Sequence, residues 1–297
     1  MKFASFTYEG DHCFGIVMNG DSILNLTKSE GWAGPKSFFE FVKEGSLEEV
    51  RSFQKQFFEG SLKEVVITNI EDVDFRWLAP IPRPSKNIFC VGKNYLDHAK
   101  EMGAEGAPTD PVIFSKVPTT VTAHLSPVLL HESVTNEVDY EGELAVIIGK
   151  EAKGVTRDKA MDYVFGFTIL NDVTARDLQS KHQQFLLAKG LDTFAPMGPY
   201  VVDRDSFLPL ESKEVVTKVN GEERQRGSFD LMIFSIPEII ATISAGITLE
   251  PGDIIATGTP KGVGKGFTPP KLLKNGDVVE IEIDGIGKLR NTFVSEK

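Results

Sequence analysis

Two acidic side chains stand at the beginning of a strongly apolar run. Glu141 and Glu143 are two residues apart and lead into the segment from Leu144 to Ile148. Side chains two apart on a strand point to the same face, so these carboxylates should lie side by side. Such a pair repels unless a cation or a proton lies between them, and oxygen ligands suit Mg²⁺, Mn²⁺ or Ca²⁺ better than Zn²⁺. The pattern therefore indicates a divalent-metal site, although a solvated acidic strand end has the same spacing.

A third acidic residue, Asp172, follows the apolar run from Phe165 to Asn171. The carboxyl ends of strands gather polar groups in many α/β sites, which makes Asp172 a candidate third carboxylate for the metal. A helix is predicted to begin just after it, so Asp172 could instead accept amide protons as a helix N-cap. Thr174 could take the capping role and leave Asp172 free. Both interpretations stay open on these residues alone.

A histidine and a glutamate share one face of a short predicted helix. His98 and Glu101 are three residues apart within Tyr95–Met102, and Gly103 ends the helix. A carboxylate beside an imidazole fixes its tautomer and raises its basicity, so this pair could take a proton from water. A surface pair with no role would have the same spacing.

Lys189 follows an apolar stretch and precedes a loop rich in Gly and Pro. A partly buried ammonium there could steady a developing enolate or alkoxide. A lysine at a helix end can also simply extend along apolar surface to solvent. The glycine-rich segment 256–264 lacks the Gly-Lys-Ser/Thr ending of a phosphate loop. We interpret it instead as a backbone-rich cradle for a carboxylate.

These residues need a framework, and the sequence predicts a strand-rich one. Apolar or alternating runs predict strands separated by Asn-Gly, Gly-Asp and Asp-Gly turns, and amphipathic spacing predicts fewer helices. The main body is therefore a β-rich α+β domain. The predicted strands are Ile88–Val91, Val112–Ser115, Glu143–Ile148, Phe165–Asn171, Val215–Val219, Asp253–Ala256 and Val278–Ile283, and the predicted helices are Tyr95–Met102, Ala175–Leu187 and Pro237–Ala245.

A small α+β unit is predicted ahead of this body. Strands Lys2–Tyr8 and Phe14–Met18 are followed by a hairpin signal at Asn19-Gly20-Asp21, and Pro35–Phe58 has the spacing of one or two amphipathic helices. Prolines at positions 80, 82 and 84 forbid a helix and weaken any sheet ladder. We therefore divide the chain into a small N-terminal α+β domain, residues 1–80, and a larger domain, residues 81–297.

Composition limits the class of protein. The 297 residues include 43 acidic and 32 basic side chains, and the formal net charge of −11 disfavours binding to nucleic acid or to anionic membranes. Hydrophobic residues make up 41%, so the chain can bury a sizeable core and is not disordered. Two cysteines cannot form a disulfide framework. The most apolar stretch, Ile239–Leu249, is shorter than the about 20 residues that span a bilayer, and no apolar signal core follows Met1, so we expect a cytoplasmic protein.

Taken in order, several segments resemble the fumarylacetoacetate hydrolase superfamily, from about residue 87 to residue 294. The resemblance implies that the larger domain is a catalytic mixed β-roll, that the protein is a homodimer, and that Mg²⁺ or Mn²⁺ is held by Glu141, Glu143 and Asp172. The matching segments are Val91-Gly92-Lys93-Asn94-Tyr95 with His98 and Glu101, Glu141-Gly142-Glu143-Leu144, Asn171 to Gln179, Lys189, Asn220-Gly221-Glu222 with Gln225, Gly227 and Met232-Ile233-Phe234, and Thr257-Gly258-Thr259-Pro260 with Gly262-Val263-Gly264.

The same resemblance implies roles for the remaining candidates. His98 and Glu101 would lie on a mobile lid over the substrate, and Lys189 would face the substrate oxygens at the metal. It thereby favours the functional interpretation of each motif over the alternatives given above. The implied substrate-binding residues are Gln179, Thr259, which would touch the substrate carboxylate, Arg176 and Tyr95.

The implied substrate is a small 2-oxo acid or dicarboxylate that chelates the ion, which then stabilises the enolate formed when the C3 bond breaks. We expect cleavage of a C–C bond: hydrolysis of an acylpyruvate or fumarylpyruvate, with His98 as base and Glu101 orienting it, or decarboxylation of oxaloacetate. The alternative is a 2-hydroxyhepta-2,4-diene-1,7-dioate-type isomerase of aromatic catabolism. A third hypothesis is a non-catalytic binding protein with this fold, which should lack one of the metal carboxylates.

Overall fold

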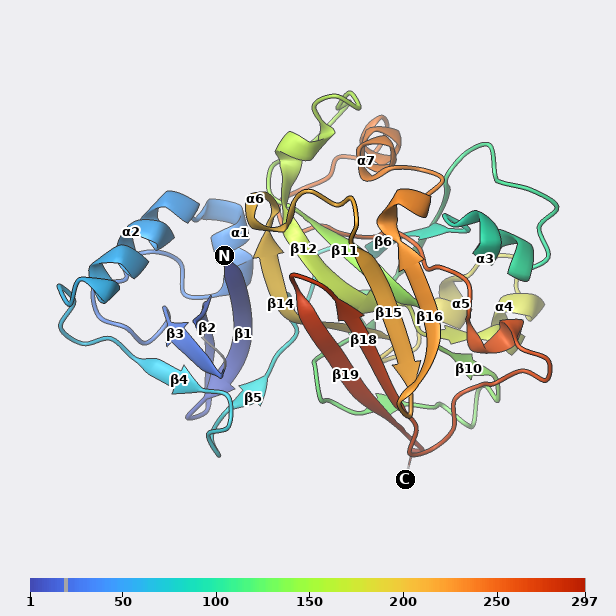
Figure 1. Cartoon of the computed structure of the whole chain (residues 1–297), viewed down its shortest axis with the longest axis horizontal. Coiled ribbons are helices and arrows are strands. Elements are labelled where there is room, and N and C mark those ends of the chain that lie inside the picture. The colour runs from blue at the N-terminus through green and yellow to red at the C-terminus, as the bar shows by residue number, and fades with distance from the viewer. Residues whose placement is uncertain (19–20, 297) are drawn as a thin grey trace.

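The computed structural model describes residues 1–18 and 21–296, and within them strands predominate over short helices (Figure 1). This confirms the prediction of a strand-rich α+β fold. The helices are α1 (Phe38–Glu44), α2 (Leu47–Phe58), α3 (Leu96–Glu101), α4 (Arg176–Lys181), α5 (Leu186–Lys189), α6 (Arg204–Phe207) and α7 (Ile236–Ser244). The strands are β1 (Lys2–Tyr8), β2 (Asp11–Val17), β3 (Ser22–Asn25), β4 (Ile67–Asn69), β5 (Arg76–Trp77), β6 (Ile88–Gly92), β7 (Val112–Lys116), β8 (Val121–Thr122), β9 (Val128–Leu129), β10 (Val138–Asp139), β11 (Gly142–Ile148), β12 (Val164–Asn171), β13 (Thr174–Ala175), β14 (Ala195–Asp203), β15 (Glu214–Val219), β16 (Glu222–Ser228), β17 (Ile254–Ala256), β18 (Val278–Ile283) and β19 (Gly287–Val294).

One long mixed sheet crosses the molecule in the order β4-β3-β2-β1-β14-β12-β11-β17-β6-β7. A second sheet, in the order β16-β15-β18-β19-β9, packs on β11, β12 and β14. Alternating apolar residues of both sheets form a shared core, because each strand turns one face toward the other layer. Leu144 and Ile169 of the first sheet and Val215 and Ile281 of the second belong to this one cluster.

The N-terminal segment continues the long sheet. Strand β1 pairs antiparallel with β14, with Phe3 opposite Val201, and β2, β3 and β4 follow outward (Figure 1). Asn19 and Gly20 of the predicted hairpin lie outside the described residues, and the flanking strands β2 and β3 pair antiparallel. The division of the chain at residue 80 stays a prediction; hydrogen bonds and apolar packing cross it.

Two helices cover this N-terminal part of the sheet, as the spacing of its phenylalanines predicts. Each begins at a serine cap: Ser37 accepts the Glu40 amide and Ser46 accepts the Glu49 amide. The Ser-x-x-Glu spacing is the sequence signature of a capping box, which satisfies amides that a helix start leaves free. The caps thus fix where each amphipathic segment starts.

Two predictions about the middle of the chain are wrong. Ala175–Leu187 is not one helix, because His182 is extended and separates α4 from α5. A straight helix would separate residues 176 and 189 by about 20 Å, whereas the break brings both side chains to one carboxylate. The predicted Gly-Pro loop is strand β14, which contains Pro196, Gly198 and Pro199 between two paired neighbours. Proline usually argues against a central strand, and the pairing with β12 shifts register where these residues lie.

Phe3 tests how strongly the two parts of the chain depend on one another. Its buried ring packs on Phe38, Phe41 and Phe165, with ring centroids 5.6, 5.3 and 6.0 Å away. We expect Phe3→Ala to lower the free energy of unfolding by about 3–5 kcal/mol through lost burial and a cavity. Urea unfolding followed by fluorescence and by circular dichroism should show one shared transition at lower urea.

Phe58→Ala is the matched control, because that ring is 68% exposed, and surface changes fall within about 0.5 kcal/mol. Two separate transitions, with only the first moved by Phe3→Ala, would contradict the expectation of one cooperative unit.

Candidate active site

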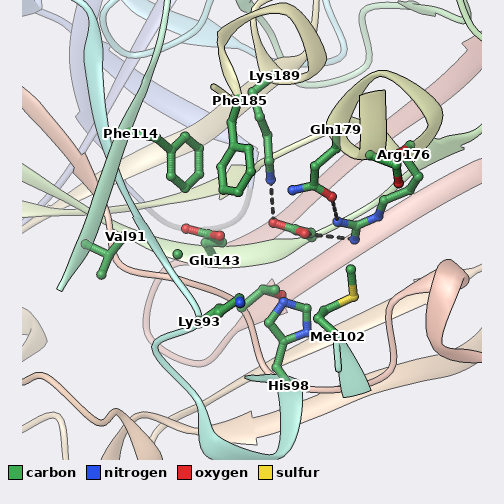
Figure 2. Close-up of a pocket in the computed structure, with 14 residues that line it drawn as sticks. Val91, Lys93, His98, Met102, Phe114, Glu143, Arg176, Gln179, Phe185 and Lys189 are labelled. Atoms are coloured by element: carbon green, nitrogen blue, oxygen red, sulfur yellow. Dashed lines mark hydrogen bonds and ion pairs between the residues drawn. The ribbon is translucent and has the colours of Figure 1, made fainter. Parts of the chain in front are cut away.

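A cavity of about 240 Å³ opens where α3, α4 and α5 meet the ends of β6, β7 and β11. Figure 2 shows His98, Lys93 and Met102 on one side of it and Lys189, Phe114 and Phe185 on the other, with Glu143 between them. It gathers charged and aromatic side chains that are far apart in the sequence. The cavity is lined by Val91, Gly92, Lys93, His98, Met102, Phe114, Glu141, Glu143, Arg176, Gln179, Ser180, Phe185, Lys189 and Thr259.

The three predicted metal carboxylates converge at the floor of this cavity. Strands β11 and β12 pair so that Gly142 lies opposite Asn171, which puts both ends of the ladder together. One oxygen of each of Glu141, Glu143 and Asp172 lies within 4.8 Å of the others, and all three residues are buried. The Asp172 amide donates to the Glu141 carbonyl (2.8 Å), which holds the two backbones in register.

Three buried cations contact this triad. Lys189 Nζ lies 2.7 Å from Glu141 Oε2 and 2.8 Å from Asp172 Oδ2. Arg176 Nη2 lies 2.8 Å from Glu141 Oε1, and Lys116 Nζ lies 2.6 Å from Asp172 Oδ1. Buried charges are tolerated only when they are paired, so these cations account for Glu141 and Asp172.

In the part of the chain that the structure describes, no lysine, arginine or histidine nitrogen lies within 4.0 Å of the Glu143 carboxylate. Among the described residues, the hydrogen bond to its carboxylate comes from the Gly258 amide (2.8 Å). Burial, together with the neighbouring charges of Asp172 and Glu141, raises the pKa of Glu143 well above its ordinary value. Burial acts on Glu141 in the same sense, but Lys189 and Arg176 outweigh it and lower the pKa of Glu141 to about 2.

The site therefore fits a hard divalent cation. A buried carboxylate that faces the cavity without a cationic partner, beside two further carboxylate oxygens, is the donor set that Mg²⁺ and Mn²⁺ prefer. Glu141, Glu143 and Asp172 are the residues that would hold the ion.

The histidine–glutamate pair lies at the cavity wall. His98 Nδ1 is 3.1 Å from Glu101 Oε2, and Glu101 Oε1 accepts the Gly262 amide at 2.9 Å. His98 lines the cavity, and Glu101 lies behind it. That these two residues belong to a mobile lid stays a prediction.

The substrate-binding candidates divide into two groups. Gln179, Arg176 and Thr259 line the cavity, and Gln179 Oε1 accepts from Arg176 Nη1 at 2.9 Å. Tyr95 is buried and lines a neighbouring cavity with Leu231 instead. Three of the predicted site residues do not line the cavity. Glu101 and Asp172 contact residues that do, namely His98 and Lys189, whereas Tyr95 lines a different cavity.

Sequence reasoning missed Lys116, Asp139 and Lys93. Lys116 ends strand β7 and is fully buried, and burial lowers its pKa although Asp172 opposes this. Its place near the apolar residues Phe114 and Val117 in the sequence could have indicated that Lys116 is buried. Asp139 is buried and accepts Arg176 Nε at 2.8 Å.

The glycine-rich segment does bind carboxylates through its amides, but they are the chain's own. Gly258, Gly262 and Gly264 donate to Glu143, Glu101 and Asp139, so these amides hold no external anion. The expected backbone cradle for carboxylates is present, but its ligands are side chains of the same chain. These acids are more than 100 residues away in the sequence, so local pattern could not reveal the contact.

Comparison with known proteins assigns the fold to a family. Residues 87–294 match the family model described as "Fumarylacetoacetate (FAA) hydrolase C-terminal". The chain belongs to the fumarylacetoacetate hydrolase family. This confirms the resemblance inferred from the motifs, and it makes the protein a member of a family of enzymes.

Relatives of this family member have different reactions in their names. The "Oxaloacetate tautomerase YisK" of Bacillus subtilis is 48% identical over 302 residues, which cover 98% of this chain and 99% of that one. A "Fumarylacetoacetate hydrolase" structure from Exiguobacterium antarcticum has 40% identity, complete coverage of both chains and a TM-score of 0.85. A "5-carboxymethyl-2-hydroxymuconate delta-isomerase" from Mycobacterium smegmatis has 33% identity, complete coverage of both chains and a TM-score of 0.75. These similarities also confirm the expected fold. No helix within residues 1–18 and 21–296 has the length and apolarity needed to cross a membrane.

The substitution Glu143→Gln tests whether Glu143 is the carboxylate of the triad whose negative charge is not balanced by a cation. The folded-state pKa of Glu143 is raised, so its contribution to stability is present below the unfolded pKa of about 4.3 and is lost as pH rises through the folded value. We expect metal-free Glu143→Gln to match the wild type near pH 4 and to be the more stable protein at pH 8. Mn²⁺ affinity should fall at least about 100-fold, since losing even an outer-shell partner weakens binding 10–100-fold.

Thermal unfolding in EDTA and titration calorimetry with Mn²⁺ check these two expectations. Glu151→Gln, at an exposed glutamate, is the control for removing one negative charge. Unchanged Mn²⁺ affinity, or a metal-free variant less stable than the wild type at pH 8, would show that Glu143 is not the uncompensated ligand.

Proposed function

We propose that this protein moves a proton at carbon 3 of a small 2-oxo dicarboxylate and so interconverts its keto and enol forms, with oxaloacetate as the first candidate. The observation that carries this proposal is the placement of a histidine base opposite a cluster that can stabilise an enolate, within one small cavity (Figure 2). Support comes from the 48% identity with an oxaloacetate tautomerase over nearly the whole of both chains.

The enolate needs positive charge near the keto oxygen. A divalent cation held by Glu141, Glu143 and Asp172 would supply Lewis-acid polarisation of that oxygen. Lys189 supplies a second positive charge from the chain itself. Burial opposes its protonation, but Asp172 and Glu141 outweigh burial and raise the pKa of Lys189, so its ammonium stays charged beside the developing enolate.

His98 is the group that moves the proton. The ionised Glu101 carboxylate can only accept, so the 3.1 Å contact puts a proton on His98 Nδ1 and leaves the lone pair on Nε2. Nε2 removes a proton from carbon 3 of the keto form and releases it to solvent, and the enolate oxygen gains a proton from solvent. In the opposite direction, the enol oxygen loses its proton to solvent, and Nε2 takes up a proton from solvent and delivers it to carbon 3.

Lys93 suits the second carboxylate of the substrate. Lys189 and Arg176 already contact Glu141, whereas Lys93 lines the cavity and has no carboxylate within 4.0 Å in the described part of the chain. Its φ of 56° is left-handed, a conformation that a lysine adopts at some expense in energy. A positive charge at the exposed edge of a small polar cavity favours dicarboxylates over monocarboxylates.

C–C cleavage is the second candidate, and the His98–Glu101 pair is the observation that favours it. The same base could activate water for hydrolysis of an acylpyruvate or fumarylpyruvate, and the same enolate forms when oxaloacetate loses CO₂. The hydrolase from Exiguobacterium antarcticum is consistent with hydrolysis, and the isomerase from Mycobacterium smegmatis with isomerisation of an unsaturated oxo-diacid. A homodimer, a cytoplasmic location and the choice between Mg²⁺ and Mn²⁺ stay predictions.

His98→Ala decides whether proton transfer depends on this base. We expect the wild type with Mg²⁺ to accelerate decay of enol-oxaloacetate, EDTA to abolish the effect, and His98→Ala to lower kcat by about 10² or more. Absorbance of the enol follows the reaction, and coupled detection of pyruvate separates tautomerisation from decarboxylation.

His12→Ala, at an exposed histidine, is the matched control. Release of pyruvate in step with loss of the enol would favour decarboxylation instead. An unchanged rate in His98→Ala would remove His98 as the base in either reaction.

Lys93→Ala tests the preference for dicarboxylates. A hydrogen bond between charged groups contributes about 1.5–3 kcal/mol, so KM for oxaloacetate should rise about 10- to 100-fold with little change in kcat. Exchange of the carbon-3 protons of 2-oxobutyrate in D₂O, a substrate without the second carboxylate, should be unaffected. Lys100→Ala on the exposed face of α3 is the control, and equal losses on both substrates would contradict the assignment.

A further inference from the structure

One glycine-rich loop, from Gly258 to Gly266, holds three carboxylates through its backbone. The Gly258 amide donates to Glu143 Oε2 (2.8 Å), the Gly262 amide to Glu101 Oε1 (2.9 Å) and the Gly264 amide to Asp139 Oδ1 (2.7 Å). These acids belong to three different parts of the site: the carboxylate triad, the histidine pair and the partner of Arg176. A single loop therefore fixes the relative positions of groups from separate elements.

The absence of a side chain at Gly266 makes room for Glu101. A Cβ added at Gly266 would lie 2.1 Å from Glu101 Oε1 and 2.4 Å from its carboxyl carbon. Gly266 has no left-handed φ, so space and not backbone conformation is what excludes a side chain there. Gly262 does have a left-handed φ of 104°, and a Cβ there would lie 1.9 Å from the Arg224 carbonyl oxygen.

Hydrogen bonds hold the two peptide units on either side of the Gly262 Cα. Its amide donates to Glu101, and its carbonyl accepts from the hydroxyl of Tyr140 at 2.8 Å. The fully buried side chain of Tyr140 cannot reverse this arrangement without leaving the core. Glu101 Oε1 is thus committed to an N–H donor, and Oε2 is left to face His98.

We propose that the loop sets the tautomer of His98, with Gly262 and Gly266 as positioning residues that act through Glu101. An amide N–H can only donate, so whatever group it contacts must accept. Glu101 held in this orientation accepts the Nδ1 proton of His98 and keeps Nε2 free for the substrate. This inference rests on the proposed function only in taking His98 as the base.

Glu101→Gln is the sharper test, because it adds no heavy atoms. If Gly262 controls the orientation, the glutamine oxygen must face the Gly262 amide, and its NH₂ must then donate to His98 Nδ1. We expect His98 to change to the Nε2–H tautomer and kcat to fall by about 10² or more, as for loss of a general base. If the loop has no control, the amide can rotate and accept from Nδ1–H, and the tautomer stays as in the wild type.

The tautomer is read without substrate, by nitrogen NMR of ¹⁵N-histidine-labelled protein with Mg²⁺ at pH 8.5, about two units above the ordinary histidine pKa of 6.5. The His98 signals are assigned by their loss in His98→Ala. This readout does not depend on turnover. A protein without tautomerase activity would therefore disprove the proposed function and still report whether the loop sets the tautomer.

Gly266→Ala supplies the second variant. We expect a mixture of His98 tautomers and a kcat at least about 10-fold lower, because the new methyl displaces Glu101 from between Gly262 and His98. Gly246→Ala is the matched control, since nothing lies within 4 Å of a Cβ there and its φ is not left-handed. The proposal is overturned if Glu101→Gln keeps the Nδ1–H tautomer, or if folded Gly266→Ala keeps the wild-type tautomer and kcat. If Gly266→Ala fails to fold, Glu101→Gln decides alone.

Discussion

Electrostatic repulsion among three buried carboxylates is the constraint on which the rest of the site depends. The pairing of β11 with β12 forces Glu141, Glu143 and Asp172 together in a poorly solvated floor. Removing charges from water is strongly unfavourable unless each finds a partner, so the surrounding chain must supply cations. Three different elements supply these cations, which are Lys189, Arg176 and Lys116. The negative charge that they leave unbalanced lies on Glu143, whose pKa is raised. The same lack of positive charge that would destabilise an empty site suits the triad to a divalent cation.

Strands, short helices and one loop each position a different set of groups in this site. The sheet fixes the acids, because strand pairing leaves no freedom in their register. Short helices bring the other cavity-lining groups that we propose contact the substrate: α3 carries His98, α4 carries Arg176 and Gln179, and α5 ends in Lys189. The loop after β17 then joins both sets through the backbone amides of Gly258, Gly262 and Gly264.

Local patterns predicted those parts of the molecule whose partners are near in sequence. Glu141 and Glu143, His98 and Glu101, and most strands could be predicted from spacing, and the order of the motifs identified the family. Lys116 could not be found in this way, because its carboxylate is 56 residues away and a lysine at a strand end is usually solvated. Strand β14 was hidden by its prolines, and the break between α4 and α5 serves a carboxylate that neither helix contains. In each case long-range pairing outweighed a correct local preference.

The backbone ladder between β1 and β14 has one more consequence. With residues 1–80 absent, β14 would become the border of the long sheet and would present unsatisfied amides and carbonyls beside exposed Phe165 and Val201. A bare, apolar border of this kind recruits strands from other molecules and leads to aggregation. The N-terminal segment therefore shields the family fold as well as extending it, and any version of this enzyme that dispenses with the segment must cover that border by other means.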